Sequence, residues 1–209
     1  MTTAAPWGRR DFLGAAALLA LCVGVPVATV QLTRVADDEA PTDRQRTIMA
    51  EVADLVIPRT DTPGGRDVGA GDFAILALAH GLSATRAPVA SGAITPAIAT
   101  FLRPDGSLRH VDWLERTLDQ AGRGDFMRRS LSERAEILAA IDATAMARGA
   151  PWLPWVAIKG LILTGYYTTE AGGSQELRYQ LVPGRFDPDL PLLADDRAWS
   201  SDWTAVEFG

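Results

Sequence analysis

Apolar residues recur at helical spacing in five stretches of the chain. In the first stretch they share one face from Ile48 onward, and Pro58 ends the run. Ser130 and Glu133 fit a capping box ahead of the fourth stretch. The later stretches cover approximately residues 71–81, 108–121, 132–148 and 151–167. This pattern predicts an all-α fold of about five helices.

The fifth stretch, which begins near Pro151, is apolar almost all the way round. Because a helix without a polar face is buried in a globular protein, we expect this helix at the centre of the fold. Trp152, Trp155, Tyr166 and Tyr167 lie on or beside it and are expected to pack in the core. After Tyr167, the Gly and Pro residues and the scarcity of helix formers predict a long, irregular and extended C-terminal segment.

The first 36 residues differ from the rest and read as a targeting segment. Arg9 and Arg10, followed by Phe12 and Leu13, resemble the twin-arginine signal, which exports proteins already folded. The apolar run that follows is rich in alanine and glycine, which favours a signal over a permanent membrane anchor. An uncleaved anchor stays open as the alternative. We therefore divide the chain into an export signal with linker, residues 1–36, and a single helical domain, residues 37–209.

Composition excludes several classes of site. The 209 residues carry a formal net charge of −6, which argues against nucleic acid as a partner, because binding it needs clustered Lys and Arg. The single cysteine, Cys22, rules out an internal disulfide, a CxxC motif and a thiolate zinc site. With only His80 and His110, a multi-histidine metal site is not expected. Both histidines are better explained as structural than as catalytic.

The motifs for common catalytic chemistry are missing. Residues 69–74 match GxGxxA, but a polar loop precedes them instead of the strand that a dinucleotide site needs. We interpret this stretch as a turn that starts a helix. The pairs Asp187/Asp189 and Asp195/Asp196 could act as acid–base carboxylates, although Asp beside Pro is usually turn chemistry. We therefore predict no catalytic residue, cofactor site or metal site in this chain.

Two aromatic residues near the C-terminus lie in a polar setting. Trp199 and Trp203 follow a proline-rich stretch and are separated by Ser200, Ser201 and Asp202. Side chains this large must pack against something. They pack either on the core of their own chain or on the surface of a partner, because tryptophan is enriched among interface anchors.

Several stretches resemble the gluconate 2-dehydrogenase subunit 3 family. Residues 158–170, which contain Gly-Tyr-Tyr-Thr, look like its signature, as do residues 182–184 and 197–200. Residues 56–64, which end in Thr-Asp-Thr-Pro-Gly, resemble the loop after that family's first helix. The resemblance covers approximately residues 45–203. Gly65 departs from it, since Ala is more usual there, and we expect Gly65 to loosen the turn.

This resemblance implies the small, non-catalytic subunit of a sugar or gluconate dehydrogenase, periplasmic or on the periplasmic face of the inner membrane. The family's small subunit has no established catalytic residues. It further implies that the FAD sits in a large partner subunit of the glucose–methanol–choline type. Electrons often leave such complexes through a cytochrome c subunit. Docking to this folded chain could carry the large subunit through the twin-arginine translocase.

The irregular segments 59–71 and 166–203 are our candidates for partner contact, because docking loops concentrate function. The residues selected as candidate contacts are Thr60, Asp61, Pro63, Gly64, Tyr166, Tyr167, Trp199 and Trp203. Two other functions stay open: a membrane-anchored interaction module and a free-standing exported hydrolase that uses Asp or Glu.

Overall fold

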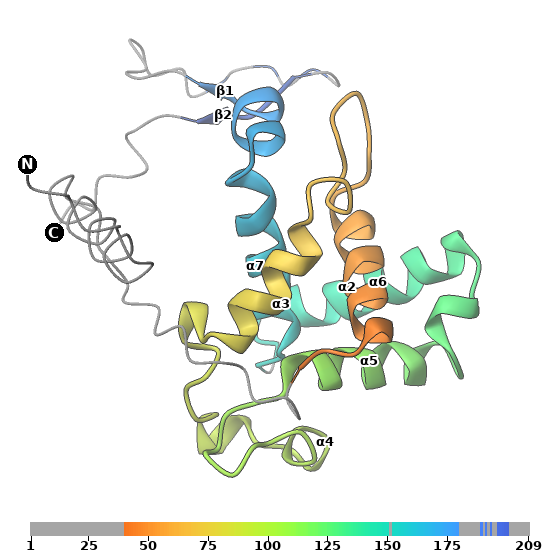
Figure 1. Ribbon diagram of the computed structural model, residues 1–209, viewed down its shortest axis with the longest axis vertical. Coiled ribbons are helices and arrows are strands. Elements are labelled where there is room, and N and C mark those ends of the chain that lie inside the picture. The colour runs from red at the N-terminus through yellow and green to blue at the C-terminus, as the bar shows by residue number, and fades with distance from the viewer. Residues whose placement is uncertain are drawn as a thin grey trace, which may run out of the picture. The chain divides into compact units, whose positions relative to one another are not determined.

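The computed structural model describes residues 40–150, 152–179, 189, 191, 193 and 196–200. Within them lie five α-helices of at least ten residues, which confirms the predicted all-α fold. These helices are α2 Asp43–Val56, α3 Ala70–Ala79, α5 His110–Ala121, α6 Leu131–Met146 and α7 Trp155–Tyr167 (Figure 1). In the described part of the chain, no helix is long and apolar enough to cross a bilayer.

Local sequence determines where α2 and α6 begin. The Thr42 hydroxyl accepts from the Gln45 amide N–H at 3.1 Å, and the Gln45 side chain accepts from the Thr42 amide N–H at 3.0 Å. Ser130 and Glu133 form the same reciprocal box at the start of α6, as predicted. Each box satisfies two backbone N–H groups that the first helical turn leaves without partners.

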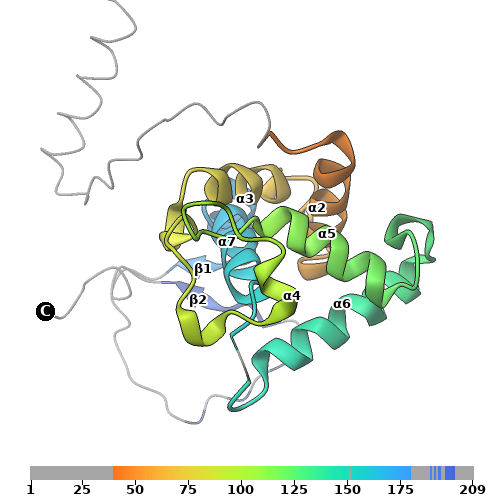
Figure 2. The ribbon, with the colours of Figure 1, turned by 90° about the horizontal axis from the view of Figure 1, so that it is seen from below.

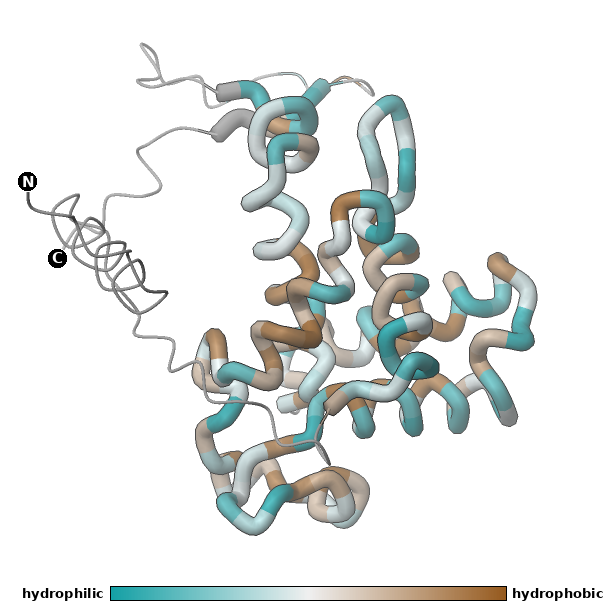
Figure 3. The backbone as a smooth tube through the Cα atoms, in the orientation of Figure 1, coloured by the Kyte–Doolittle hydropathy of each residue, from teal (hydrophilic) through white to brown (hydrophobic). Residues whose placement is uncertain are grey.

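The apolar helix α3 packs against both α2 and α7, and Figure 3 shows it as hydrophobic over most of its length. Glycines permit this close packing. A Cβ on Gly71 would lie 2.9 Å from the Met49 carbonyl oxygen of α2, and one on Gly165 would lie 2.7 Å from the Phe73 ring. The largest fully buried side chains of the described residues are Ile48, Met49, Ile75, Leu108, Leu114, Leu118, Phe126, Trp155, Ile158, Leu161, Ile162 and Tyr166.

The GxGxxA stretch starts a helix, as interpreted from the sequence. Gly69 adopts a left-handed φ of 73° at the N-cap of α3, and residues 65–69 ahead of it are turns. The space that Gly71 leaves open is occupied by the backbone of α2. The pyrophosphate of a dinucleotide therefore has no room at this glycine.

The prediction that α7 is buried all round, with Trp152 and Tyr167 in the core, is wrong. Val156 and Tyr167 of α7 are 45% and 41% exposed, because α7 buries mainly the side that faces α3, and Trp152, just before α7, is 43% exposed. It also contacts α6, where Asp142 accepts hydrogen bonds from Lys159 Nζ and Trp155 Nε1 at 2.8 and 2.7 Å. Lys159, the single lysine of the chain, thus ties two helices together.

The region between α3 and α5 contains short turns of helix: η2 Leu82–Ala84, η3 Ser91–Ala93 and α4 Pro96–Ala99 (Figure 2). An isolated antiparallel bridge joins Leu102 to Leu108. A further short turn, η4 Phe126–Arg128, links α5 to α6.

The chain does not become extended directly after Tyr167, which corrects that part of the prediction. A π-helix, η5 Ala171–Glu176, follows instead. Gly172 makes this possible, because a Cβ there would lie 2.3 Å from the Tyr166 carbonyl oxygen. The chain then forms β1 Arg178–Tyr179, which pairs in parallel with β2 Trp199–Ser200.

Candidate functional site

The loop between α2 and α3 is held by its own short-range bonds. The Gly64 amide N–H donates to Asp67 Oδ2 at 2.8 Å, and Arg59 forms an ion pair with Asp67 at 2.5 Å. The Arg59 hydrogen bond, with that of the Gly64 amide, lowers the pKa of the Asp67 carboxyl below its ordinary value. Asp67 is therefore a charged acceptor that closes the loop at neutral pH.

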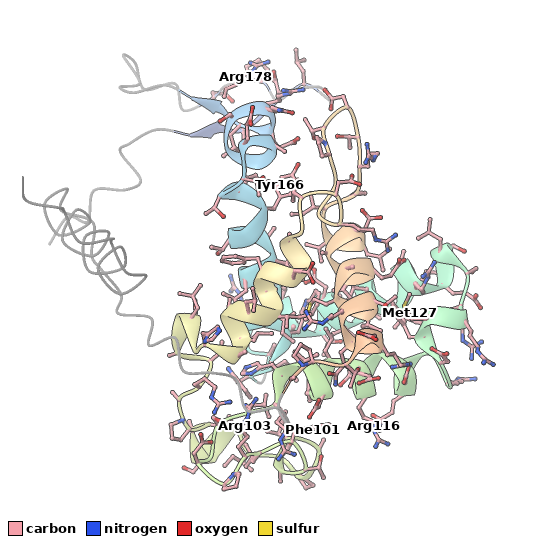
Figure 4. The ribbon with its side chains drawn as sticks, in the orientation of Figure 1. Phe101, Arg103, Arg116, Met127, Tyr166 and Arg178 are labelled. Carbon is pink, nitrogen blue, oxygen red and sulfur yellow. The ribbon has the colours of Figure 1, made fainter. Side chains whose placement is uncertain are left out.

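Two side chains join this loop to the C-terminal part of the chain. The Tyr166 hydroxyl on α7 donates to the Pro63 carbonyl at 2.9 Å, and Figure 4 labels Tyr166 between α7 and the loop. The Thr62 hydroxyl, 5% exposed, donates to the Glu176 carboxylate in η5 at 2.6 Å. Because hydrogen bonds to charged groups are stronger than neutral ones, Thr62 and Glu176 form the firmer of these two links.

A third link comes from Arg197, which precedes β2. Its guanidinium forms an ion pair with Asp61 and donates to the Gln175 carbonyl. A hydrogen bond from Thr60 and the charge of Arg197 lower the pKa of the Asp61 carboxyl. Three separated segments thus form one surface, which we call the composite surface: residues 59–67, residues 171–178 and Arg197.

Four predicted contact residues reach or border this surface. Thr60 and Asp61 are exposed, Pro63 is half-buried, and Tyr167 is 41% exposed. Tyr167 packs edge-on against the Tyr166 ring, with 5.2 Å between ring centroids. Their contact with a partner remains a prediction.

The prediction that Gly64 and Tyr166 contact a partner is wrong, because both residues are buried inside the chain and cannot meet a partner directly. Their role in this fold is to position the loop. Trp199 lies in the β1–β2 ladder, where its backbone pairs with Arg178 (Figure 4). Arg9, Arg10, Phe12, Leu13 and Trp203 lie outside the described residues.

Sequence reasoning did not select Thr62, Glu176 or Arg197. The two partners of the Thr62 bond are 114 positions apart, and Arg197 lies 136 positions from Asp61. No local spacing signals such pairs. The burial of Thr62 within a polar loop marks this residue in the structure, but burial cannot be read from the sequence.

The family model for gluconate 2-dehydrogenase subunit 3 matches residues 43–184, which is more than half of the chain. The chain belongs to the gluconate 2-dehydrogenase subunit 3 family. The match begins with α2 and extends past β1, so it includes most of the composite surface, while Arg197 lies beyond it. No curated protein and no solved structure matched the chain.

The family's loop has a tight backbone contact in this chain. A Cβ on Gly65 would lie 2.4 Å from the Ala53 carbonyl oxygen of α2. The Gly65 amide N–H also donates to the Ile57 carbonyl at 2.8 Å, and the Gly65 carbonyl accepts from the Ala70 amide at 3.0 Å. The prediction that Gly65 loosens the turn is therefore wrong. Gly65 instead lets the loop close onto α2.

Buried charge in this subunit is paired across elements. Glu51 of α2, 4% exposed, forms ion pairs with Arg66 of the loop and with Arg134 of α6. Near the other end of α2, Arg44 forms ion pairs with Glu115, Asp119 and Asp125. These carboxylates are occupied in holding helices together.

Of the two Asp pairs considered for acid–base chemistry, the structure describes Asp189 and Asp196. Asp196 accepts from the Leu193 amide at 2.9 Å, which is the turn chemistry expected of it. Asp187 and Asp195 lie outside the described residues. Among the residues the structure describes, no group of three or more His, Cys, Asp or Glu side chains could hold a metal ion.

Proposed function

We propose that this chain is the non-catalytic small subunit of an FAD-dependent sugar or gluconate dehydrogenase, and that the composite surface docks onto the flavin-bearing large subunit. Membership of the gluconate 2-dehydrogenase subunit 3 family supports the assignment to a dehydrogenase complex. In this proposal the chain assists the folding, stability and twin-arginine export of the large subunit. A cytochrome c subunit completes the electron path.

The observation that carries the proposal is the anchoring of two distant irregular segments to each other. Thr62–Glu176 and Asp61–Arg197 fix loop and tail in one arrangement before any partner arrives. A preorganised surface loses less conformational entropy on binding than free loops do. Exposed Tyr167, which packs against the loop-holding Tyr166, supplies an aromatic anchor with a polar rim, as at protein interfaces.

Export follows from the order of events. A flavoprotein must take up its cofactor in the cytoplasm, so its complex must cross the membrane folded. Arg9 and Arg10 supply the signal for that route. The destination is the periplasm, or the periplasmic face of the inner membrane.

Docking can be tested with a matched pair of exposed aromatic residues: Tyr167 at the last position of α7 and Trp152 just before its first turn. The chain is tagged, expressed with the large subunit in its own host, and purified as a complex. Tyr167→Arg places a bulky charge at the composite surface, and Trp152→Arg places the same charge at the other end. We expect Tyr167→Arg to reduce the co-purified flavin at least tenfold and Trp152→Arg to leave it unchanged.

Thermal melting of both variants checks that each still folds. Full retention of the flavoprotein by Tyr167→Arg, or a wild-type chain that purifies alone and colourless, contradicts the docking proposal. Export is tested separately with Arg9→Lys and Arg10→Lys combined. We expect flavin-linked dehydrogenase activity to disappear from the periplasmic fraction and collect in the cytoplasm, whereas unchanged periplasmic activity refutes the escort role.

A further inference from the structure

A cavity of about 330 Å³ lies near the start of α7, far from the composite surface. Ala157, in the first turn of α7, is one wall, and Tyr167 follows about 15 Å further along the helix, at 1.5 Å per residue. Most of the remaining wall is small and apolar, including Pro88, Val89 and Ala93. A cavity of roughly 150 Å³ lined by apolar groups already binds benzene, so a single ring fits here.

His110 contributes a polar atom to this cavity. The side chain is 6% exposed and lies on the wall. Its Nδ1 is 3.0 Å from the Leu108 carbonyl oxygen, which can only accept, so Nδ1 carries the proton. Nε2 then carries a lone pair and can accept a hydrogen bond, and no described residue donates one to it. Arg103, labelled in Figure 4, donates to the same carbonyl.

The electrostatic setting keeps this imidazole neutral. Burial lowers the pKa of His110 to about 4. At neutral pH the ring therefore presents an acceptor. A ligand that supplies an O–H or N–H can donate to this acceptor and so form a hydrogen bond with it.

Part of the backbone that lines the cavity is strained. Ser83 and Ala84 both line the cavity and both adopt left-handed φ values, 56° and 60°. Such conformations are unfavourable for residues with a Cβ and concentrate at binding sites. Thr85 follows them, 5% exposed, and its hydroxyl donates to the Leu82 carbonyl at 3.0 Å, which fixes the strained turn in place.

We propose that this cavity binds a small aromatic molecule with one O–H or N–H group, of the phenol or indole class. The donor of the ligand bonds to His110 Nε2, and its ring lies against Trp152, which lines the cavity and is 43% exposed. Aromatic rings favour offset or edge contacts of this kind. This site is independent of the docking proposal, since its lining shares no residue with the composite surface.

The test compares 4-methylphenol with toluene, which has the same ring and methyl group but no donor. The full chain, labelled with ¹⁵N, is titrated with each probe while the imidazole nitrogen resonances are recorded. The chain contains only two histidines, so His80 serves as the internal control. We expect 4-methylphenol to shift the Nε2 resonance of His110, to leave His80 unchanged, and to bind roughly fivefold more tightly than toluene, as one hydrogen bond implies.

Variants locate the site. His110→Phe should abolish the preference for 4-methylphenol over toluene, and Trp152→Phe should remove the fluorescence change caused by binding. Ala93→Leu fills the cavity and leaves the imidazole intact, so it should abolish binding even if His110→Phe does not fold. An unchanged His110 Nε2 resonance, equal affinity for the two probes, or undiminished binding by Ala93→Leu overturns the proposal.

Discussion

Gly65→Ala is the most direct test of the contact between the loop and α2. The added Cβ would lie 2.4 Å from the Ala53 carbonyl oxygen and 2.9 Å from its carbonyl carbon. Both atoms are helix backbone, which cannot rotate away as a side chain does. The loop must therefore move away from α2.

The magnitude follows from what that movement breaks. Overpacking in a well-packed region typically destabilises by about 1–3 kcal/mol. The hydrogen bonds from the Gly65 amide to Ile57 and from the Ala70 amide to Gly65 also lengthen. Each contributes about 1 kcal/mol. We expect Gly65→Ala to lower the free energy of unfolding by about 3 kcal/mol in total.

Gly160→Ala is the matched control. Gly160 lies within α7, and a Cβ there would meet nothing within 4 Å. Alanine is favoured over glycine inside a helix by about 1 kcal/mol, so this variant should be stabilised. Urea unfolding of both full-length variants, followed by circular dichroism, gives the two changes with their signs. A Gly65→Ala chain within about 0.5 kcal/mol of wild type, a size usual for neutral surface changes, would refute the close-contact argument.

Three further changes test other parts of the structure. Glu51→Gln leaves the Arg134 charge at the core without its carboxylate, so urea unfolding should show a loss of about 3 kcal/mol; a loss below about 1 kcal/mol contradicts the pairing. Tyr166→Phe removes one bond to the Pro63 carbonyl and should lower the free energy of unfolding by about 1 kcal/mol, with increased proteolysis of loop 59–67 as the second readout; an unchanged cleavage rate argues against the loop-fixing role. His110 has a pKa of about 4 in the folded chain and about 6.5 when unfolded, so the unfolded chain binds more protons between these values. Stability should therefore fall as pH is lowered from 6.5 towards 4, by up to about 3 kcal/mol, and His110→Phe should remove that part of the slope; equal slopes for wild type and variant contradict the assignment.

The helices could be read from the sequence because their signals are local. The capping box at Ser130 brings the predicted bounds of α6 within about two residues of the structure, and α2 ends just before Pro58, as predicted. Helix η5 could not be read in this way. Its glycines indicate irregular chain, and only the contact between Gly172 and the Tyr166 carbonyl makes them helical.

The candidate site, too, could be predicted from the sequence only where its signals are local. The sequence picked out the loop and the C-terminal segment as irregular and polar, and its motifs indicated the family. It could not show that Thr62 meets Glu176 or that Asp61 meets Arg197, because these pairs depend on how α7 packs against α3. For the same reason it placed Gly64 and Tyr166 at a partner surface, where burial excludes them.

By itself, then, the sequence determined the helical periodicity, the helix ends and the family motifs, all of which depend on residues within a few positions of one another. The tertiary structure decided which side chains are buried and which distant segments touch. Gly65 shows the physical reason: whether a missing Cβ loosens a turn or permits a close contact depends on what lies opposite, and here that is the Ala53 carbonyl of another element.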